Sequence, residues 1–226
     1  MVIPYVNIHT HKGKECTDNV RSILNQFPSE WMNKKPVGWF SVGIHPWYIN
    51  SGDQASEELV NMEKAFSQKG CIAAGEAGLD KITRTDWELQ KEIFIQQVKL
   101  SESYHKPMII HCVKAYSELL GLRKELKAEN VWIFHGFNSS LEMAGQIIGH
   151  GCMLSFGEQL LKEGSKAETV LQKTGVEHWF LETDDSDISI ETVYSKAALI
   201  TGKKEDEIKI LIQDNFNRVF QPDLPL

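Results

Sequence analysis

The stretch from residue 70 to residue 111 decides the fold, because it contains GCIAAGE (70–76), WELQKEIFIQQVKLSESY (87–104) and PMIIH (107–111) in succession. The first and third segments are short and apolar, which is typical of buried parallel strands. The middle segment places Leu89, Ile93, Gln97 and Leu100 at a spacing that puts them on one face of a helix. The stretch therefore predicts a strand, a helix and a second strand.

The same alternation extends in both directions along the chain. Five further segments have the composition of buried strands: PYVNIH (4–9), VGWFSVGIH (37–45), VWIFHG (131–136), CMLSFG (152–157) and WFLETD (179–184). The ends of the strands recur at intervals of roughly 20 to 36 residues, the size of a strand plus a crossover helix. The sequence predicts an α/β fold, a TIM-like (β/α) barrel with seven clear βα units.

The eighth strand of such a barrel is not evident. After Asp184 the pattern is helical, first in TVYSKAALITG (192–202) and then in KEDEIKILIQDNFNRVF (204–220). Gly202 and the two lysines after it predict the end of one helix and the start of the next. An eighth strand, if present, is expected after Asp184.

Length and composition favour one ordinary globular domain over residues 1–226, with no linker or low-complexity segment. A net charge of −7 gives no general attraction to nucleic-acid phosphates, so an anionic substrate needs local positive charge, which bound metal ions would supply. The four cysteines, Cys16, Cys71, Cys112 and Cys152, form no C-x-x-C pair. With no leader and no long apolar stretch, we expect a cytoplasmic protein without membrane association.

Histidines and carboxylates gather where the predicted strands end. His9 and His11 are alternate residues after the first strand, so both imidazoles can face one ion, although such a pair alone is a weak signal. His111 and His135 also follow strands, and in a (β/α) barrel the carboxyl ends of the strands converge. Glu76 and Asp184 add carboxylates, and a mixed nitrogen and oxygen ligand set suits zinc, manganese or magnesium.

Other residues and other chemistries are weaker candidates. His45, beside Pro46, could orient a substrate or a metal ligand, or could cap the strand. Glu182 is the less favoured ligand, because strand alternation sends it to the face opposite Asp184. Motifs of serine hydrolases, P-loop enzymes and dinucleotide enzymes are absent after the strands. Cys112 adjoins His111, but neighbouring strand residues point to opposite faces, which favours a structural thiol.

Taken together and in this order, the motifs resemble the TatD family of metal-dependent hydrolases, which are (β/α)-barrel phosphodiesterases with deoxyribonuclease activity. The resemblance runs through most of the chain. It rests on NIHTH (7–11), GIHP (43–46), GEAGLD (75–80), KPMIIHC (106–112), FHGF (134–137), LSFG (154–157), LETD (181–184) and NFNRVF (215–220).

The resemblance implies a set of roles for individual residues. Asp184 would hold or deprotonate the attacking water, and Glu76, the second residue with a catalytic role, would bridge two divalent metal ions. The implied metal ligands are His9, His11, Glu76, His111, His135 and Asp184. We expect His45 and Lys114 to contact the substrate.

Departures from the family pattern concern the metal and the substrate, and one of them is the loop after Asp184, which is short and reads DSDISIE (185–191). Asn7 stands where the family has Asp, which removes a negative charge but keeps an oxygen that accepts hydrogen bonds. Trp47 stands where a second His often follows the proline. After His111 the chain reads Cys-Val-Lys-Ala (112–115) where the family usually reads Ser-Arg-Asp-Ala, so the Arg is missing. Lys114 could replace it as a point charge, without the bidentate geometry of a guanidinium group.

Three functions are consistent with these observations. The leading hypothesis is hydrolysis of a phosphoester, with DNA or a nucleotide as the substrate, and no protein partner is evident. The second keeps the site but gives it an amide or lactone substrate, an alternative that the acidic chain and the missing Arg favour. The third is a non-catalytic barrel that binds a ligand. The presence of suitable residues at all six metal-binding positions argues against this third hypothesis.

Overall fold

The computed structural model describes residues 3–12 and 19–221. Its strands follow one another in the sheet in the order of the sequence, and the pairs that it defines are parallel. The eight strands are β1 (Tyr5–Thr10), β2 (Val20–Gln26), β3 (Phe40–Val42), β4 (Cys71–Asp80), β5 (Met108–Val113), β6 (Trp132–Phe134), β7 (Met153–Phe156) and β8 (Trp179–Leu181). The predicted fold class, a TIM-like α/β barrel, is confirmed.

Helices follow most of the strands. The α-helices are α1 (Pro28–Asn33), α2 (Gly52–Phe66), α3 (Trp87–Ser103), α4 (Tyr116–Glu125), α5 (Leu141–Gly149), α6 (Lys166–Lys173), α7 (Ile190–Thr201) and α8 (Glu205–Phe220). Three short 3₁₀ helices are η1 (Pro46–Tyr48), η2 (Glu158–Leu161) and η3 (Val176–His178). None of the helices in the described part of the chain combines the length and the apolar character that crossing a membrane requires.

The expectation about the eighth strand is wrong. The strand that the sequence pattern missed is β2, which lies between the first two predicted strands, whereas the described residues after Asp184 form helices. Its sequence, VRSILNQ, mixes polar and apolar residues and begins only ten positions after β1 ends. The buried Asn25 is compatible with a strand interior because its side-chain oxygen accepts a hydrogen bond from Ser41 Oγ at 3.1 Å.

The chain divides into two compact units, which we describe separately. The first unit comprises residues 1–24 and 133–221, and the second comprises residues 25–132 and 222–226; residues 1–2, 13–18 (with Cys16) and 222–226 lie outside the described part. The expectation of a single domain over residues 1–226 stays a prediction.

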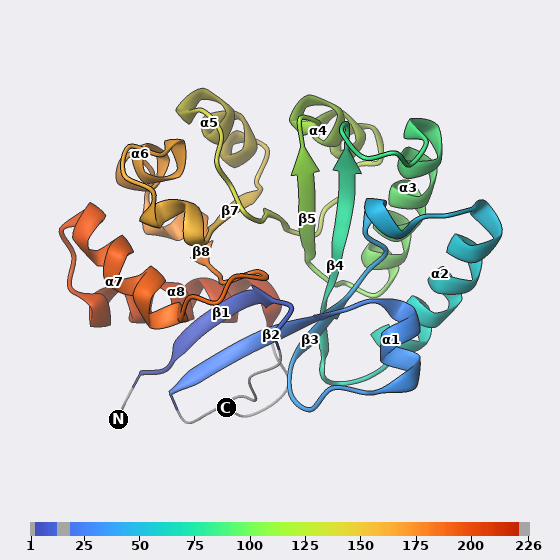
Figure 1. Cartoon of the computed structure of the whole chain (residues 1–226), viewed down its shortest axis with the longest axis horizontal. Coiled ribbons are helices and arrows are strands. Elements are labelled where there is room, and N and C mark those ends of the chain that lie inside the picture. The colour runs from blue at the N-terminus through green and yellow to red at the C-terminus, as the bar shows by residue number, and fades with distance from the viewer. Residues whose placement is uncertain (1–2, 13–18, 222–226) are drawn as a thin grey trace. The chain divides into compact units, whose positions relative to one another are not determined.

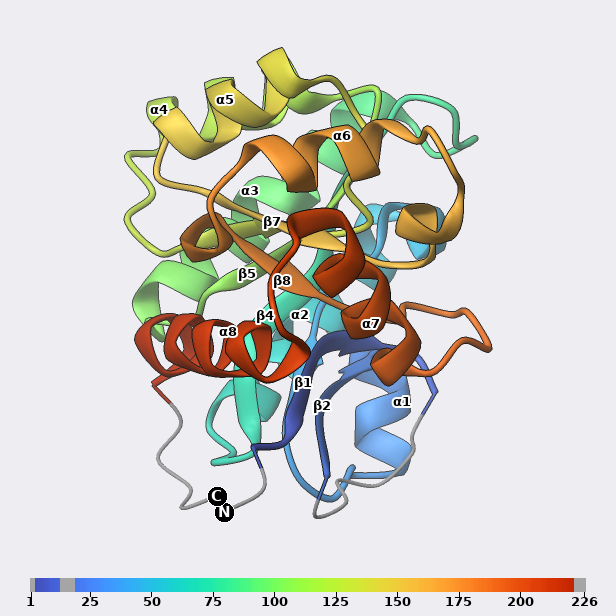
Figure 2. The same cartoon turned by 90° about the vertical axis from the view of Figure 1, so that its left-hand side faces the viewer.

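In the first unit, helices α7 and α8 pack on β1, and α8 also packs on β8 (Figure 2). The Tyr194 hydroxyl of α7 donates to the Val6 carbonyl and accepts from the Val6 amide, which fixes the helix to the strand. The Phe180 and Phe220 rings lie 5.7 Å apart between β8 and α8. Val6 and Ile8 are fully buried, so the alternate residues of β1, Asn7 and His9, belong to the other face of the strand.

In the second unit, α3 packs against β4 (Figure 1). The predicted helix over residues 87–104 is confirmed, and it begins where the Asp86 side chain accepts a hydrogen bond from the Leu89 amide at 2.9 Å. The buried Phe94 of this helix meets the Trp132 ring edge-on, with 5.3 Å between the ring centroids. This packing holds α3 against β4, the strand that carries Glu76, and against Trp132 of β6.

Candidate metal centre

The end of β1 is joined to the segment after β8 by backbone hydrogen bonds. The Asp184 amide donates to the His9 carbonyl at 3.0 Å, and the His11 amide donates to the Asp184 carbonyl at 3.1 Å. Asp184 has a φ of 52°, in the left-handed region that non-glycine residues rarely occupy. Because both of its backbone polar groups are bonded, this conformation is fixed, and the carboxylate is held beside the two imidazoles.

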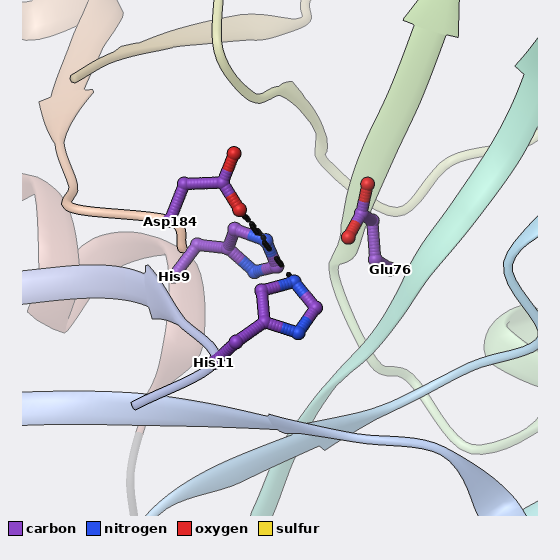
Figure 3. Close-up of side chains that lie close together, drawn as sticks. All are labelled: His9, His11, Glu76 and Asp184. Carbon is purple, nitrogen blue, oxygen red and sulfur yellow. Dashed lines mark ion pairs between the residues drawn. The ribbon is translucent and has the colours of Figure 1, made fainter. Parts of the chain in front are cut away.

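The side chains of His9, His11 and Asp184 converge in the first unit (Figure 3). The Nε2 atoms of both histidines lie 3.5 Å from the same atom, Asp184 Oδ1. Donor atoms about 2.0–2.2 Å from one tetrahedral ion are about 3.4 Å apart, so these separations suit one divalent cation. Glu76, drawn in the same figure, belongs to the second unit.

Asn7, one of the departures from the family pattern, forms hydrogen bonds to Thr183 with both polar atoms of its side-chain amide. Its Nδ2 donates to Thr183 Oγ1 at 2.8 Å, and its Oδ1 accepts from the Thr183 amide at 3.1 Å. The residue is almost fully buried. Asn7 therefore ties β1 to the residue that precedes Asp184.

His135 follows β6 and lies close to His9, with 4.6 Å between the ring centroids. Its Nδ1 lies 3.4 Å from Glu182 Oε1, which also accepts a hydrogen bond from the Gly136 amide at 2.6 Å. Glu182 is fully buried. A histidine that binds a metal commonly holds a carboxylate with its other nitrogen, so Glu182 suits the role of orienting His135.

In the second unit, Glu76 on β4 and His111 on β5 are in direct contact. Glu76 Oε1 lies 2.7 Å from His111 Nδ1, and the Glu76 amide donates to the side-chain oxygen of Asn25 at 2.7 Å. Gly78 allows the two strands to approach, because a Cβ atom there would lie only 1.8 Å from the His111 carbonyl oxygen. Both site residues are buried, at 4% and 8% exposure.

Asp80, the last residue of β4, orients the His111 ring. Its Oδ2 lies 3.2 Å from His111 Nε2 and accepts a hydrogen bond from the Trp47 indole at 2.6 Å. Burial acts to raise the pKa of Asp80, but the hydrogen bonds from Trp47, the Ile82 amide and His111 outweigh it, so the pKa lies below its ordinary value. An ionised Asp80 favours the His111 tautomer that carries its proton on Nε2, and in that tautomer Nδ1 is the nitrogen available to an ion.

His45 caps η1 and contacts the same carboxylate. Its Nδ1 accepts a hydrogen bond from the Trp47 amide at 3.1 Å, and its Nε2 lies 3.3 Å from Glu76 Oε1. Because the Nδ1 lone pair is already used, the neutral ring carries its proton on Nε2. Although its position would allow His45 to join an ion-binding group with Glu76 and His111, this proton makes it a hydrogen-bond donor.

The structure thus brings the predicted residues into two groups. Within the first unit these are His9, His11 and Asp184, with His135 against His9; within the second they are His45, Glu76 and His111. Lys114, the other expected substrate contact, is exposed just after β5. Burial raises the pKa of the Cys112 thiol to about 12, which keeps it protonated and disfavours a thiol nucleophile. Asn25 and Asp80 are supporting residues that the strand-end pattern did not single out, and Glu182, the less favoured ligand in the sequence analysis, is a supporting residue of His135.

Comparison with known proteins shows the family of this chain. The model of the TatD-related DNase family matches residues 15–221. The chain belongs to the TatD family of metal-dependent hydrolases. It is 24% identical over 200 residues to YcfH of Escherichia coli, described as an uncharacterized metal-dependent hydrolase, across 81% of this chain and 74% of that protein.

Two further relatives of this TatD-family chain are informative. The 3'-5' RNA nuclease TATDN2 of Homo sapiens is 28% identical over 162 residues, which are 69% of this chain and 21% of the human protein. The crystal structure of the TatD homologue YjjV of Escherichia coli superposes with a TM-score of 0.82 at 20% identity and covers all of both chains. This likeness shows the fold, while the family rests on the sequence match.

Proposed function

We propose that this TatD-family hydrolase cleaves phosphodiester bonds in nucleic acids with the help of two divalent metal ions. The observation that carries the proposal is the convergence of His9 Nε2 and His11 Nε2 on one oxygen of Asp184. This donor set, two imidazoles and a carboxylate, suits zinc and manganese. The substrate class is supported by the family model, that of a TatD-related DNase, and by the RNA nuclease among the relatives.

The two groups of residues would hold the ions. His9, His11 and Asp184 would bind one ion, and His111 Nδ1 and Glu76 would bind the other. Bound divalent ions lower the pKa of water and neutralise charge that develops on a phosphoryl group. The assignment of His135 as a ligand and of Glu76 as a bridging ligand stays a prediction from the family resemblance.

Three protein side chains would act on the attacking water and the substrate. Asp184 is half-exposed, so its carboxylate can orient the attacking water and accept its proton. His45 Nε2, as a hydrogen-bond donor, can contact a phosphoryl oxygen of the substrate. Lys114, which is exposed just after β5, would place the point charge of its ammonium group near the substrate.

Activity assays with matched variants test the proposal. The protein loaded with Mg, Mn or Zn should cleave single-stranded DNA or RNA and bis(p-nitrophenyl) phosphate. Replacing Asp184→Asn should lower kcat about 10²- to 10⁴-fold, the usual contribution of a general base. Asp185→Asn is the matched control, because this neighbouring carboxylate is 80% exposed.

Two outcomes would change the assignment. Hydrolysis confined to lactones or cyclic amides would favour the second hypothesis, which places a carbon-centred substrate on the same residues. A metal-loaded protein inactive on every phosphodiester would exclude the proposed substrate class. Unchanged turnover after His111→Ala and His135→Ala would exclude catalysis by these residues altogether.

A further inference from the structure

A cavity of about 320 Å³ opens beside His45 in the second unit, between η1 and helices α1 and α2. Its wall includes Phe27, Glu30, His45, Tyr48, Gln54 and Glu58. A volume of this size is at the lower end of the range for small-molecule sites. The residues come from loops and helices outside the strands that carry Glu76 and His111.

The acidic wall of the cavity disfavours an anionic group beside Glu30 and Glu58. Glu30 and Glu58 are acidic, and the described residues that line the wall include neither Lys nor Arg. The Oε2 atom of Glu58 is buried and accepts no hydrogen bond from the described residues. A carboxylate in the wall with one oxygen that lacks a donor favours a ligand that brings N–H groups over one that brings only acceptors.

The aromatic side chains of the cavity favour a flat occupant. Tyr48 is 51% exposed, and its ring packs against the Phe27 ring with 4.7 Å between the centroids and 65° between the planes. This edge contact fixes the tyrosine while leaving much of it accessible. Nucleobases stack on such rings, because every base has a flat aromatic face.

His45 connects the cavity to the metal-binding residues. It lines the cavity, and its Nε2 lies 3.3 Å from Glu76 Oε1. A substrate whose phosphoryl group is held by His45 can therefore place the adjoining nucleoside in the cavity.

We propose that this cavity is a subsite for a nucleobase that carries an exocyclic amino group, namely cytosine, adenine or guanine. The inference rests on the proposed phosphodiesterase function and specifies its substrate. The base would stack on Tyr48 and donate its amino N–H to Glu58, as cytosine N4 donates to acidic side chains in DNA-binding proteins. Thymine and uracil have a carbonyl oxygen at C4, where cytosine has its amino group, and a carboxylate repels that oxygen.

The test uses two bases of the same shape. The p-nitrophenyl esters of 5-methyldeoxycytidine 5'-phosphate and thymidine 5'-phosphate differ in the group at C4 and in the proton on N3. We expect the metal-loaded wild type to show at least a 10-fold lower KM for the 5-methylcytosine ester. In Glu58→Gln this ratio should fall to near 1, because an amide both donates and accepts. Methyl p-nitrophenyl phosphate, which has no base, should be hydrolysed equally by both proteins.

The matched control is Glu57→Gln, on the same helix but exposed and outside the cavity wall; it should keep the wild-type ratio. Tyr48→Ala should raise KM for both nucleotide esters to a similar extent. Equal KM values for the two esters in the wild type, or a preference that survives Glu58→Gln, would overturn the subsite. Thermal unfolding of each variant shows whether it is folded.

A separate binding measurement distinguishes failure of the subsite from failure of the proposed function. If methyl p-nitrophenyl phosphate is not hydrolysed, the phosphodiesterase proposal fails, and the subsite is then judged by calorimetric binding of 5-methyldeoxycytidine and thymidine. The same 10-fold preference and its loss in Glu58→Gln would support the subsite. Equal or undetectable binding of the two nucleosides, or tighter binding of tetramethylammonium than of either, would overturn it.

Discussion

Asp80 determines which nitrogen of His111 can bind an ion. Its carboxylate lies 3.2 Å from His111 Nε2 and accepts hydrogen bonds from the Trp47 indole and the Ile82 amide. Since these hydrogen bonds keep the pKa of Asp80 below its ordinary value, the carboxylate stays ionised at neutral pH. Trp47 thus has a structural role in this chain at a position where the family often has a second histidine.

Replacing Asp80→Asn should weaken metal binding about 10- to 100-fold, because an amide group orients the imidazole less strongly and no longer increases its basicity. Metal affinity is measured by competition with a chromophoric chelator. The matched control is Asp53→Asn, an exposed carboxylate in the first turn of α2. An unchanged affinity in a folded Asp80→Asn protein would show that His111 needs no carboxylate partner.

At the residue scale, the sequence predicted the candidate ligands better than the residues that support them. His9, His11, Glu76, His111 and Asp184 were selected because each ends or follows an apolar segment of the sequence, although Glu76 and His111 lie within β4 and β5. Strand alternation set Glu182 apart from Asp184, but it could not show that Glu182 contacts His135 and the Gly136 amide. Such contacts depend on which strands are neighbours in the sheet, and the sequence around a single residue does not show this.

At the scale of elements, helix α8 begins at a cluster of polar side chains. The Glu205 carboxylate accepts hydrogen bonds from Ser195 Oγ of α7, at 2.6 Å, and from the Tyr5 hydroxyl of β1. The Lys209 ammonium lies 3.8 Å from the Tyr5 ring centroid. The hydrogen bond from Ser195, followed by that from Tyr5, lowers the pKa of Glu205 below its ordinary value of 4.5. This carboxylate joins β1, α7 and α8.

The lowered pKa of Glu205 predicts a stability that depends on pH. Because the ionised form is favoured in the folded state, its contribution is full above pH 4.5 and disappears as the pH falls through the folded-state pKa. Glu205→Gln should cost about 1–2 kcal/mol at pH 7, after allowance for solvent screening, and the difference should vanish in acid.

Urea unfolding of wild type and variant at pH 7, 5 and 3.5 measures this difference. Glu207→Gln serves as the control, because Glu207 is exposed and its carboxylate pairs with Lys203 on the helix surface. A Glu205→Gln cost that stays constant from pH 7 to pH 3.5 would contradict the assignment.

Most of the elements could be predicted from local signals, and the exception has a physical reason. The end of α7 was predicted at Gly202, whose φ of 68° suits glycine, and α8 begins at Glu205 as expected. Strand β2 was missed because Ser22, Asn25 and Gln26 interrupt its apolar residues. A polar strand is stable only through partners from elsewhere in the chain, such as Ser41 for Asn25.

At the scale of the whole molecule, the order of the strands was predictable because each right-handed strand, helix and strand unit places the next strand beside the previous one. The connection between β8 and β1 was not predictable from the sequence. It depends on an isolated bridge between Thr10 and Asp184, and no local pattern encodes that bridge. That bridge lies between His11 and the strand residue His9. The pairing of the first strand with the end of the last therefore creates the first metal-binding group.

Because ligands of the proposed ions lie in both units, metal binding should stabilise the entire chain. An ion present at 100 times its Kd stabilises the folded state by about 2.7 kcal/mol, which for a chain of this size raises the Tm by roughly 5–11 °C. Scanning calorimetry with and without Mn or Zn should show such an increase for each ion bound. Replacing His11→Ala or Glu76→Gln should each remove about half of the total. His105→Asn, at an exposed position with a φ of 52° that Asn tolerates, should keep all of it. A metal-dependent increase in Tm that is the same in all four proteins would place the ions elsewhere.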